Sequence, residues 1–325
     1  MVAQRPVVTM AFHELSALSS AAVLALAETC AAVITAEGSE TPSAREQKLV
    51  SDVFEALVGR IWPQPLNPHV PVGLSGLITT RRQRQEVMQL LTVLAFVEPR
   101  LDEAKVALLV RIAAELQVEA AVVADLQEVC RHHVLKAFGD MYRRTFHDFN
   151  ADGVVQGYAR FILPLLGIGI DQQHLTRYAA LAEAPAGSLG EALHAYYRSN
   201  GFPYPGSRKG LPYDYVALHD VHHVITGYGT DPAGELQVLA FSMGLFPDHA
   251  LLIALPPLLQ FQVGIADPLA GSVAPTLKDQ LDAPAFAIAL QRGAAATGPL
   301  RDFHWDFWDW IERPLVAVRR DLTVL

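Results

Sequence analysis

Histidine and acidic side chains gather in one part of the chain, between His219 and Glu235. The run His219-Asp220-Val221-His222-His223 holds three imidazoles and one carboxylate, and Glu235 follows twelve residues after His223. A mixed set of nitrogen and oxygen ligands suits zinc, iron, manganese or cobalt better than calcium, which takes oxygen ligands. The cluster therefore predicts a divalent metal site, with zinc as the first expectation and iron, manganese or cobalt as alternatives.

The spacing of the run predicts which of these side chains act together. A helix is expected over about 213–227, and successive side chains on a helix are rotated by about 100°. With His219 at zero, His223 lies near 40°, Asp220 near 100° and His222 near −60°. Two histidines at i and i+4 are the usual way in which one helix presents two imidazoles to one ion. His219, His223 and Asp220 therefore share one helix face.

A second helix is expected to return Glu235 to this face. The glycines at 227–229 end the first helix, Asp231 is a good N-cap, and Pro232 suits the first helical position. The helix predicted over 233–246 then carries Glu235 in its first turn. A helix–turn–helix that folds back on itself would bring this carboxylate to the two histidines.

These arguments define the expected site residues. We expect His219, His223 and Glu235 to bind the metal, with Asp220 as a further ligand or as a residue that orients one. His222 lies off the face and is open to a role as ligand, acid–base group or surface residue. His222 and Asp220 are the candidate catalytic residues, because they could move a proton close to the ion.

Two other histidine motifs compete with this interpretation. Zinc peptidases carry His-Glu-x-x-His, but Asp220 stands where that glutamate would be. HD-type phosphohydrolases are helical and contain His-Asp, and they require a further upstream histidine and a downstream aspartate. His194 and Asp248 are available for those positions, although the spacing to His223 and Glu235 would then be unexplained.

The elements that must position the site are expected to be helical throughout. Helical spacing of apolar residues occurs over about 11–36, 43–60, 81–97, 101–116, 119–130 and 175–183, and Ser188 is the expected N-cap of a further helix. Prolines 256 and 257 are expected to break a helix. Residues 148–153 resemble the start of a calcium loop, but Ala159 stands where the bidentate glutamate is needed. This stretch is therefore expected to be a linker between two helical domains, 1–150 and 151–325.

Composition narrows the classes of function. The 325 residues are 51% hydrophobic and carry a net charge of −9, which argues against binding to nucleic acid. The two cysteines, Cys30 and Cys130, form no disulfide framework and no thiolate zinc site. The start of the chain lacks the pattern of a signal peptide, and no apolar run reaches the length of a membrane span. We expect a cytoplasmic protein, soluble or peripheral on the inner face of the membrane.

Residues 151–325 resemble the coenzyme Q biosynthesis protein 4 family in several motifs that occur in order. The spacing of His219-Asp220-x-x-His223 and Glu235 is that of the family, and residues 185–190, Pro-Ala-Gly-Ser-Leu-Gly, are similar to its Pro-x-Gly-Thr/Ser-Leu-Gly. Residues 223–227 and 234–236 match its pattern around the ligands. Arg292-Gly293, Trp310, Pro314-Leu315 and Arg319 are similar to its C-terminal pattern.

The resemblance implies an all-α protein, often a homodimer, with a divalent metal beside an apolar pocket for a polyprenyl chain. It implies a role in ubiquinone biosynthesis, either as an organiser of the other quinone-biosynthesis proteins or in C1 decarboxylation and hydroxylation of a prenylated hydroxybenzoate. The family has a basic run before His-Asp, where this chain has Val216-Ala217-Leu218. Arg208 and Lys209 are the candidates to supply that charge to an acidic substrate or cofactor.

The first half contains a shorter resemblance. Residues 84–125 resemble the TerB-like helical domains, because a hydrophobic helix and an acidic turn precede Leu101-Asp102-Glu103 at the start of a second helix. The turn here is Glu98-Pro99-Arg100, so no metal site is carried over from that family, and a helical packing or docking module is expected.

Three functions are therefore weighed. The first is a metal-dependent enzyme, an oxidative decarboxylase that acts on a prenylated aromatic acid. The second is a non-catalytic scaffold that binds a prenyl lipid and organises quinone-biosynthesis enzymes, with the metal holding the helix–turn–helix. The third is an HD-type phosphohydrolase. Release of carbon dioxide from a prenylated hydroxybenzoate distinguishes the first from the second.

Overall fold

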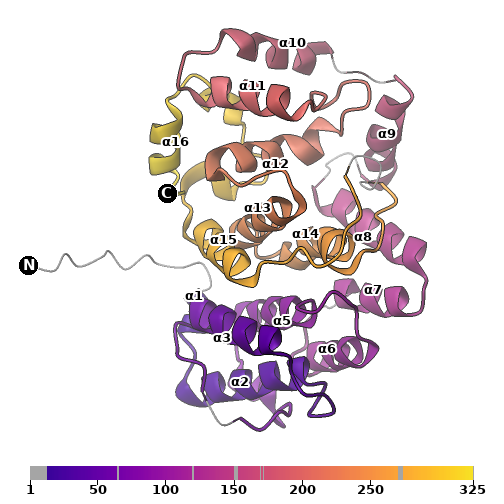
Figure 1. Cartoon of the computed structure of the whole chain (residues 1–325), viewed down its shortest axis with the longest axis vertical. Coiled ribbons are helices and arrows are strands. Elements are labelled where there is room, and N and C mark those ends of the chain that lie inside the picture. The colour runs from indigo at the N-terminus through magenta and orange to yellow at the C-terminus, as the bar shows by residue number, and fades with distance from the viewer. Residues whose placement is uncertain are drawn as a thin grey trace, which may run out of the picture.

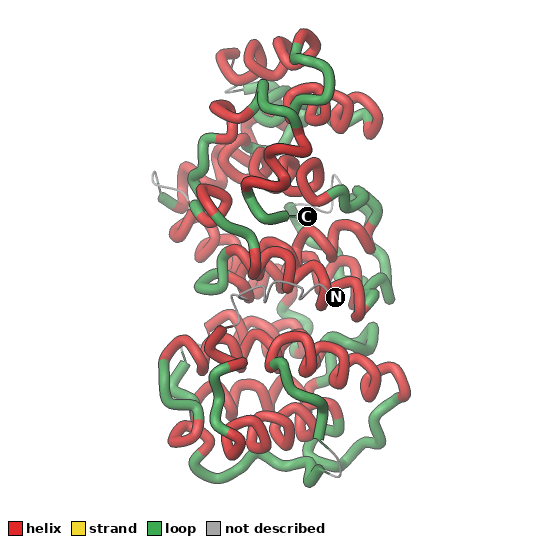
Figure 2. The backbone as a smooth tube through the Cα atoms, turned by 90° about the vertical axis from the view of Figure 1, so that its left-hand side faces the viewer, coloured by secondary structure: helices red, strands yellow, loops and turns green. Residues whose placement is uncertain are grey.

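The computed structural model describes residues 13–63, 66–118, 121–149, 153–168, 170, 172–269 and 274–324. Within these ranges the chain consists of helices and loops, and its only β-type pairing is an isolated bridge between Ser188 and Pro314 (Figure 2). The prediction of an all-α fold is confirmed.

The first half contains eight helices among its described residues. They are α1 (His13–Ser16), α2 (Ser20–Ile34), α3 (Ala44–Val58), α4 (Leu74–Leu77), α5 (Arg81–Ala95), α6 (Glu103–Glu115), α7 (Ala121–Cys130) and α8 (Val134–Phe149). The helix expected over 11–36 is divided, because Ser19 caps a new helix at Ser20. The capping box of Ser43 and Glu46 at the start of α3 is present as predicted.

The described residues of the second half form helices, of which α12 and α13 are the longest. They are α9 (Val154–Leu165), α10 (Gln172–Ala180), η1 (Leu181–Glu183), α11 (Leu189–Asn200), α12 (Tyr213–Thr226), α13 (Pro232–Leu245), α14 (Ala250–Pro257), the π-helix η2 (Leu258–Val263), α15 (Ala283–Ala295), η4 (Gly298–Arg301), η5 (Phe307–Trp310) and α16 (Leu315–Asp321). The break expected at residues 256–257 is wrong, because α14 continues directly into η2. Two adjacent prolines remove two N–H donors, and the chain here passes into a wider π-turn without leaving the helical path.

A close crossing of α13 and α15 lies near the middle of the molecule (Figure 1). An added Cβ at Gly293 would lie 1.9 Å from the carbonyl oxygen of Phe241, and one at Gly244 would lie 2.4 Å from the carbonyl oxygen of Leu290. Only glycine permits this approach of two backbones. The crossing fixes α13, which carries Glu235.

The hydrophobic core continues across the middle of the chain. One buried cluster joins residues between Leu15 and Phe146 to residues between Leu236 and Ala294, and α3 packs on α15. The predicted domain boundary falls in the turn between α8 and α9, where residues 150–152 of the calcium-like loop lie outside the described part. The division into two domains stays a prediction, and the shared core shows that the two halves pack together.

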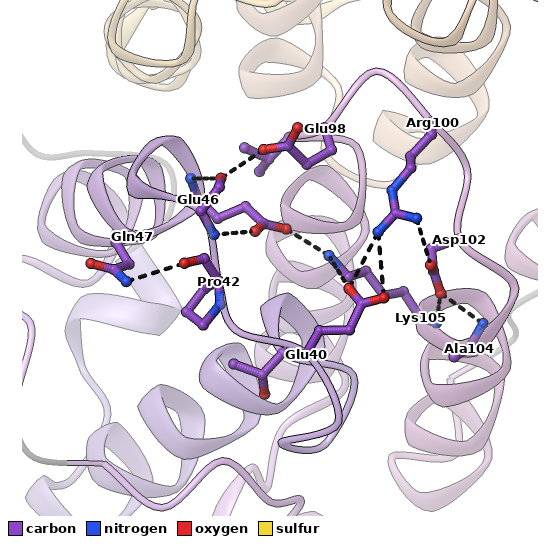
Figure 3. Close-up of polar contacts among 12 residues, drawn as sticks. Glu40, Pro42, Glu46, Gln47, Glu98, Arg100, Asp102, Ala104 and Lys105 are labelled. Atoms are coloured by element: carbon purple, nitrogen blue, oxygen red, sulfur yellow. Dashed lines mark hydrogen bonds and ion pairs between the residues drawn. The ribbon is translucent and has the colours of Figure 1, made fainter.

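A polar network fixes α3 to α6 in the first half (Figure 3). The buried Lys105 ammonium lies 2.6 Å from Glu46 Oε1, while the other carboxylate oxygen of Glu46 accepts from the Ser43 N–H at 2.8 Å. Arg100 pairs with Glu40 at 3.4 Å at the rim of the network. All partners of the buried charges come from the first half, so the network serves the packing of α3 and α6. The resemblance of residues 84–125, which span α5 to α7, stays a prediction.

Candidate metal centre

Residues that end one helix and cap the next form the hairpin of α12 and α13, as the sequence predicted. Gly227 ends α12 in the left-handed conformation with φ 78°, and Asp231 caps α13 by accepting from the N–H groups of Ala233 and Gly234. An added Cβ at Gly234 would lie 2.2 Å from the carbonyl oxygen of Gly229, so glycine is required where the turn packs on the first turn of α13. The two helices therefore fold back, and Glu235 faces α12.

The described residues contain one cluster of potential metal ligands, formed by His219, His223 and Glu235. The two Nε2 atoms are 3.1 Å apart, His219 Nε2 is 3.1 Å from Glu235 Oε2, and His223 Nε2 is 3.4 Å from Glu235 Oε1. A tetrahedral ion with bonds near 2.05 Å separates its ligand atoms by about 3.3 Å. These separations, which involve both carboxylate oxygens of Glu235, are close to that value, and the donor set fits a divalent metal.

The backbone holds His223 in the tautomer that a metal needs. Its Nδ1 lies 3.2 Å from the carbonyl oxygen of Tyr228, which can only accept, so the proton sits on Nδ1 and Nε2 is free to face Glu235. Arg292 supports this turn, because its guanidinium donates to the carbonyl of Thr226 at 3.2 Å and lies 4.9 Å from the centre of the Tyr228 ring. The second half thus supplies an outer layer of contacts behind the ligand.

Arg319 completes the C-terminal end of α12. Its Nε donates to the carbonyl of Ile225 at 2.9 Å and its Nη2 donates to the carbonyl of Val224 at 3.0 Å. A cation at this end satisfies carbonyls that have no partner in the helix and opposes the helix dipole. Arg292 and Arg319 belong to the C-terminal motifs noted in the sequence, and the structure places both at the end of the helix that carries the histidines.

Contacts between Glu235 and the two histidines shift the pKa values of the cluster. Burial alone would raise the pKa of Glu235, but hydrogen bonds and charge from His219 and His223 lower it to about 2. Burial alone would lower the pKa of His219, and the hydrogen bond and charge of Glu235 raise it instead. The carboxylate is therefore ionised at neutral pH, as a metal ligand must be, and a metal ion that binds His219 would displace a proton from its imidazole.

Asp220 lies apart from these three ligand atoms, and its assignment as a metal ligand is not supported by the geometry. Its two oxygens accept hydrogen bonds from the hydroxyls of Tyr196, at 3.2 Å, and Tyr197. Burial raises the pKa of Asp220. A side chain 100° from His219 faces α11 rather than α13, so the tyrosines of α11 take both oxygens. Nothing in the sequence pattern marked Tyr196 and Tyr197 as neighbours of the site.

His222 also lies outside the ligand cluster. Its Nδ1 shares a hydrogen bond of 3.0 Å with the hydroxyl of Ser242, and its ring lies between those of Phe241 and Phe246. Its Nε2 is buried without a hydrogen-bond partner in the described structure. Burial lowers the pKa of His222 well below its usual value, so its imidazole is neutral. Of the roles that the sequence left open, surface residue is excluded.

A cavity of about 400 Å³ opens beside the cluster. His219 and Glu235 line it together with apolar side chains such as Leu239, Phe246 and Phe261. Cavities of this size and lining are typical of sites for small organic ligands. An ion held by the three ligands would therefore meet a bound molecule in apolar surroundings.

The two basic candidates differ in their relation to this cavity. Lys209 lines it, whereas Arg208 lies against Gly167, where an added Cβ would be 3.7 Å from its Nε. Lys209 is held in the left-handed conformation with φ 68°, which is strained for a residue with a side chain. Lys209 is thus the cation best placed to meet an acidic group in the cavity.

The geometry does not assemble the site of an HD-type phosphohydrolase. The Nδ1 of His194 lies 3.4 Å from the hydroxyl of Tyr204, and Asp248 pairs with Arg82 of α5 at 3.3 Å. Within the described part of the chain, neither side chain joins the ligand cluster around His219.

Comparison of the chain with protein-family models, with curated proteins and with solved structures found no match. Among the described residues, no helix combines the length and the apolar composition that crossing a bilayer requires.

Proposed function

We propose that this chain is a metal-dependent protein of ubiquinone biosynthesis that acts on a prenylated hydroxybenzoate, removing the ring carboxylate at C1 with hydroxylation there. The observation that carries the proposal is the convergence of His219, His223 and Glu235, of which His219 and Glu235 line an apolar cavity. The proposal includes the homodimer, the quinone-biosynthesis partners and the peripheral membrane contact expected from the resemblance.

The proposal gives different roles to the residues that would hold the ion and to those that line the cavity. His219, His223 and Glu235 would hold the ion, which supplies positive charge to polarise a carboxylate or phenolate. Leu239, Phe246 and other apolar side chains offer a water-poor surface to the prenyl chain, and Lys209 offers a positive charge to the acid group. Zinc has no redox chemistry, so the hydroxylation requires a redox-active ion such as iron, manganese or cobalt.

The test begins with the metal content of the purified protein. We expect one divalent ion per chain, and we expect His219→Ala and Glu235→Ala to lose it. His194→Ala is the matched control, because it removes a histidine from the neighbouring helix α11 that does not belong to the cluster. Unchanged stoichiometry in His219→Ala or Glu235→Ala would refute the ligand assignment.

One observation favours a second function, the non-catalytic prenyl-lipid scaffold. One of the two candidate catalytic residues, Asp220, is already engaged, since its two oxygens accept hydrogen bonds from two tyrosines. Metal-loaded protein incubated with a prenylated hydroxybenzoate and oxygen distinguishes the functions. Carbon dioxide release that is absent from Glu235→Ala supports the enzyme, whereas lipid binding without release supports the scaffold.

A further inference from the structure

Helix α9 lies at the right-hand edge of the molecule in Figure 1, and several of its large apolar side chains are exposed. Val155, Ile162 and Leu166 are 77%, 47% and 67% exposed, and their spacing of seven and four residues places them within about 40° of one another on the helix. Gly157 faces the opposite way, where an added Cβ would lie 2.4 Å from the Phe146 ring of α8. The helix therefore packs on α8 with one side and leaves an apolar side uncovered.

This exposure is concentrated rather than scattered. Of the fourteen large hydrophobic residues that are exposed in the described part of the chain, five fall between Val155 and Ile168. A contiguous apolar patch on a protein surface marks a contact site, whereas single exposed residues need no explanation. Among the described residues, the exposed large hydrophobic side chains are thus most concentrated around α9.

The loop at the cavity wall continues this surface. Arg208 contacts Gly167, just after α9, and the neighbouring Lys209 lines the cavity. Phe202, which also lines the cavity, is 40% exposed at the start of the same loop. The apolar stripe of α9 and the wall of the cavity therefore adjoin through residues 202–211.

Two basic residues lie beside the apolar stripe. Arg208 and Lys209 are both exposed in the loop 202–211, on a chain whose net charge is −9. Basic residues beside an exposed apolar helix face match an anionic lipid surface, where each contributes about 1 kcal/mol.

We infer that α9 and the loop 202–211 form a docking face for an anionic bilayer, so that a lipid passes from the bilayer directly into the cavity. The docking face is defined by Val155, Ile162, Leu163, Leu166, Ile168, Phe202, Arg208 and Lys209. The source of the ligand rests on the proposed function, but docking itself requires no metal. The helix would lie in the plane of the interface with its stripe inserted and the two cations at the level of the headgroups.

Co-sedimentation of the full chain with vesicles tests the inference. We expect binding to vesicles of phosphatidylcholine mixed with phosphatidylglycerol, weaker binding to phosphatidylcholine alone, and loss of the difference at high salt. The double variant Arg208→Gln/Lys209→Gln should bind the anionic vesicles about thirtyfold more weakly. Ile162→Gln/Leu166→Gln should weaken binding about tenfold or more to both kinds. Val316→Gln, which changes an equally exposed residue of α16, should bind as the wild type.

The contrary outcomes are equally defined. If both double variants bind vesicles as the wild type does, or if Val316→Gln loses binding as much as they do, the docking face is refuted. A change of molar mass in light scattering for Ile162→Gln/Leu166→Gln, with vesicle binding intact, assigns the stripe to a second copy instead. His219→Ala should retain vesicle binding, so a failure of the metal proposal and a failure of the docking face are separate results.

Discussion

A buried acid links the two halves of the chain and makes their packing sensitive to pH. Glu86 of α5 is fully buried, and its carboxylate pairs with Arg82 at 2.9 Å. Arg82 also reaches Asp248 in the loop after α13, and Gln89, on the next turn of α5, donates to the carbonyl of Pro247 in that loop. Glu86 therefore lies where α5 meets the loop that follows α13.

The environment of Glu86 favours its protonated form. Burial raises its pKa from 4.5 to about 7, and the hydrogen bond and charge of Arg82 offset only part of that effect. Between these two values the folded chain keeps a proton that the unfolded chain has lost. The contribution of Glu86 to stability is therefore complete below pH 4.5 and is lost as the pH rises through 7.

The loss can be estimated from the shift. One pKa unit corresponds to about 1.4 kcal/mol, so raising the pH from about 5 to about 8 removes about 2.5 kcal/mol of stability through Glu86. Glu86→Gln keeps the shape and abolishes the charge, so the variant should gain about this amount on the wild type between the two pH values.

Urea unfolding at the two pH values measures the effect as the difference in free energy between variant and wild type. Asp52→Asn is the control, because it removes a surface carboxylate of α3 whose ion-pair partner is a lysine, Lys48. A difference for Glu86→Gln that does not change from pH 5 to pH 8 would show that Glu86 is not held protonated in the folded chain.

Two further substitutions test the packing that supports the site. Gly293→Ala should destabilise the chain by about 3 kcal/mol, because its Cβ would strike the backbone of Phe241 at the crossing of α13 and α15. Gly139→Ala in α8 is the control, because its Cβ would meet nothing within 4 Å, and it should leave the midpoint temperature of unfolding unchanged or slightly raised. Lys105→Met should cost about 3–5 kcal/mol in urea unfolding at neutral pH, because it leaves the buried carboxylate of Glu46 unpaired; an equally stable variant would mean that Glu46 is neutral or reaches water.

The hairpin of the site was predictable because local chemistry determines it. Gly227, Asp231 and Pro232 end one helix and start the next through their own backbone preferences, and the i,i+4 spacing of His219 and His223 sets their common face. These signals need no knowledge of distant contacts, and they predicted that His219, His223 and Glu235 lie together.

The sequence did not predict features that depend on which helix packs against which face of another. Asp220 lies on the arc predicted for the ligands, but Tyr196 and Tyr197 of α11 take its oxygens, and that neighbour is set by tertiary packing. The π-helix after Pro257 was also not predictable, because a proline removes an N–H donor but does not determine which donor the freed carbonyl then accepts from.

The contribution of the first half to the cavity follows from the same packing. Tyr142 and Thr145 of α8 line the cavity together with Glu235 of α13, and the hydroxyl of Tyr142 donates to the buried Asp267 at 2.7 Å. A ligand in this space therefore touches both halves of the chain at once. Binding that favours the packed arrangement must stabilise both halves, because a ligand stabilises whatever state forms its complete site. Helix α8 is thus part of the cavity wall, and a shortened chain that begins at α9 would lack that part of it.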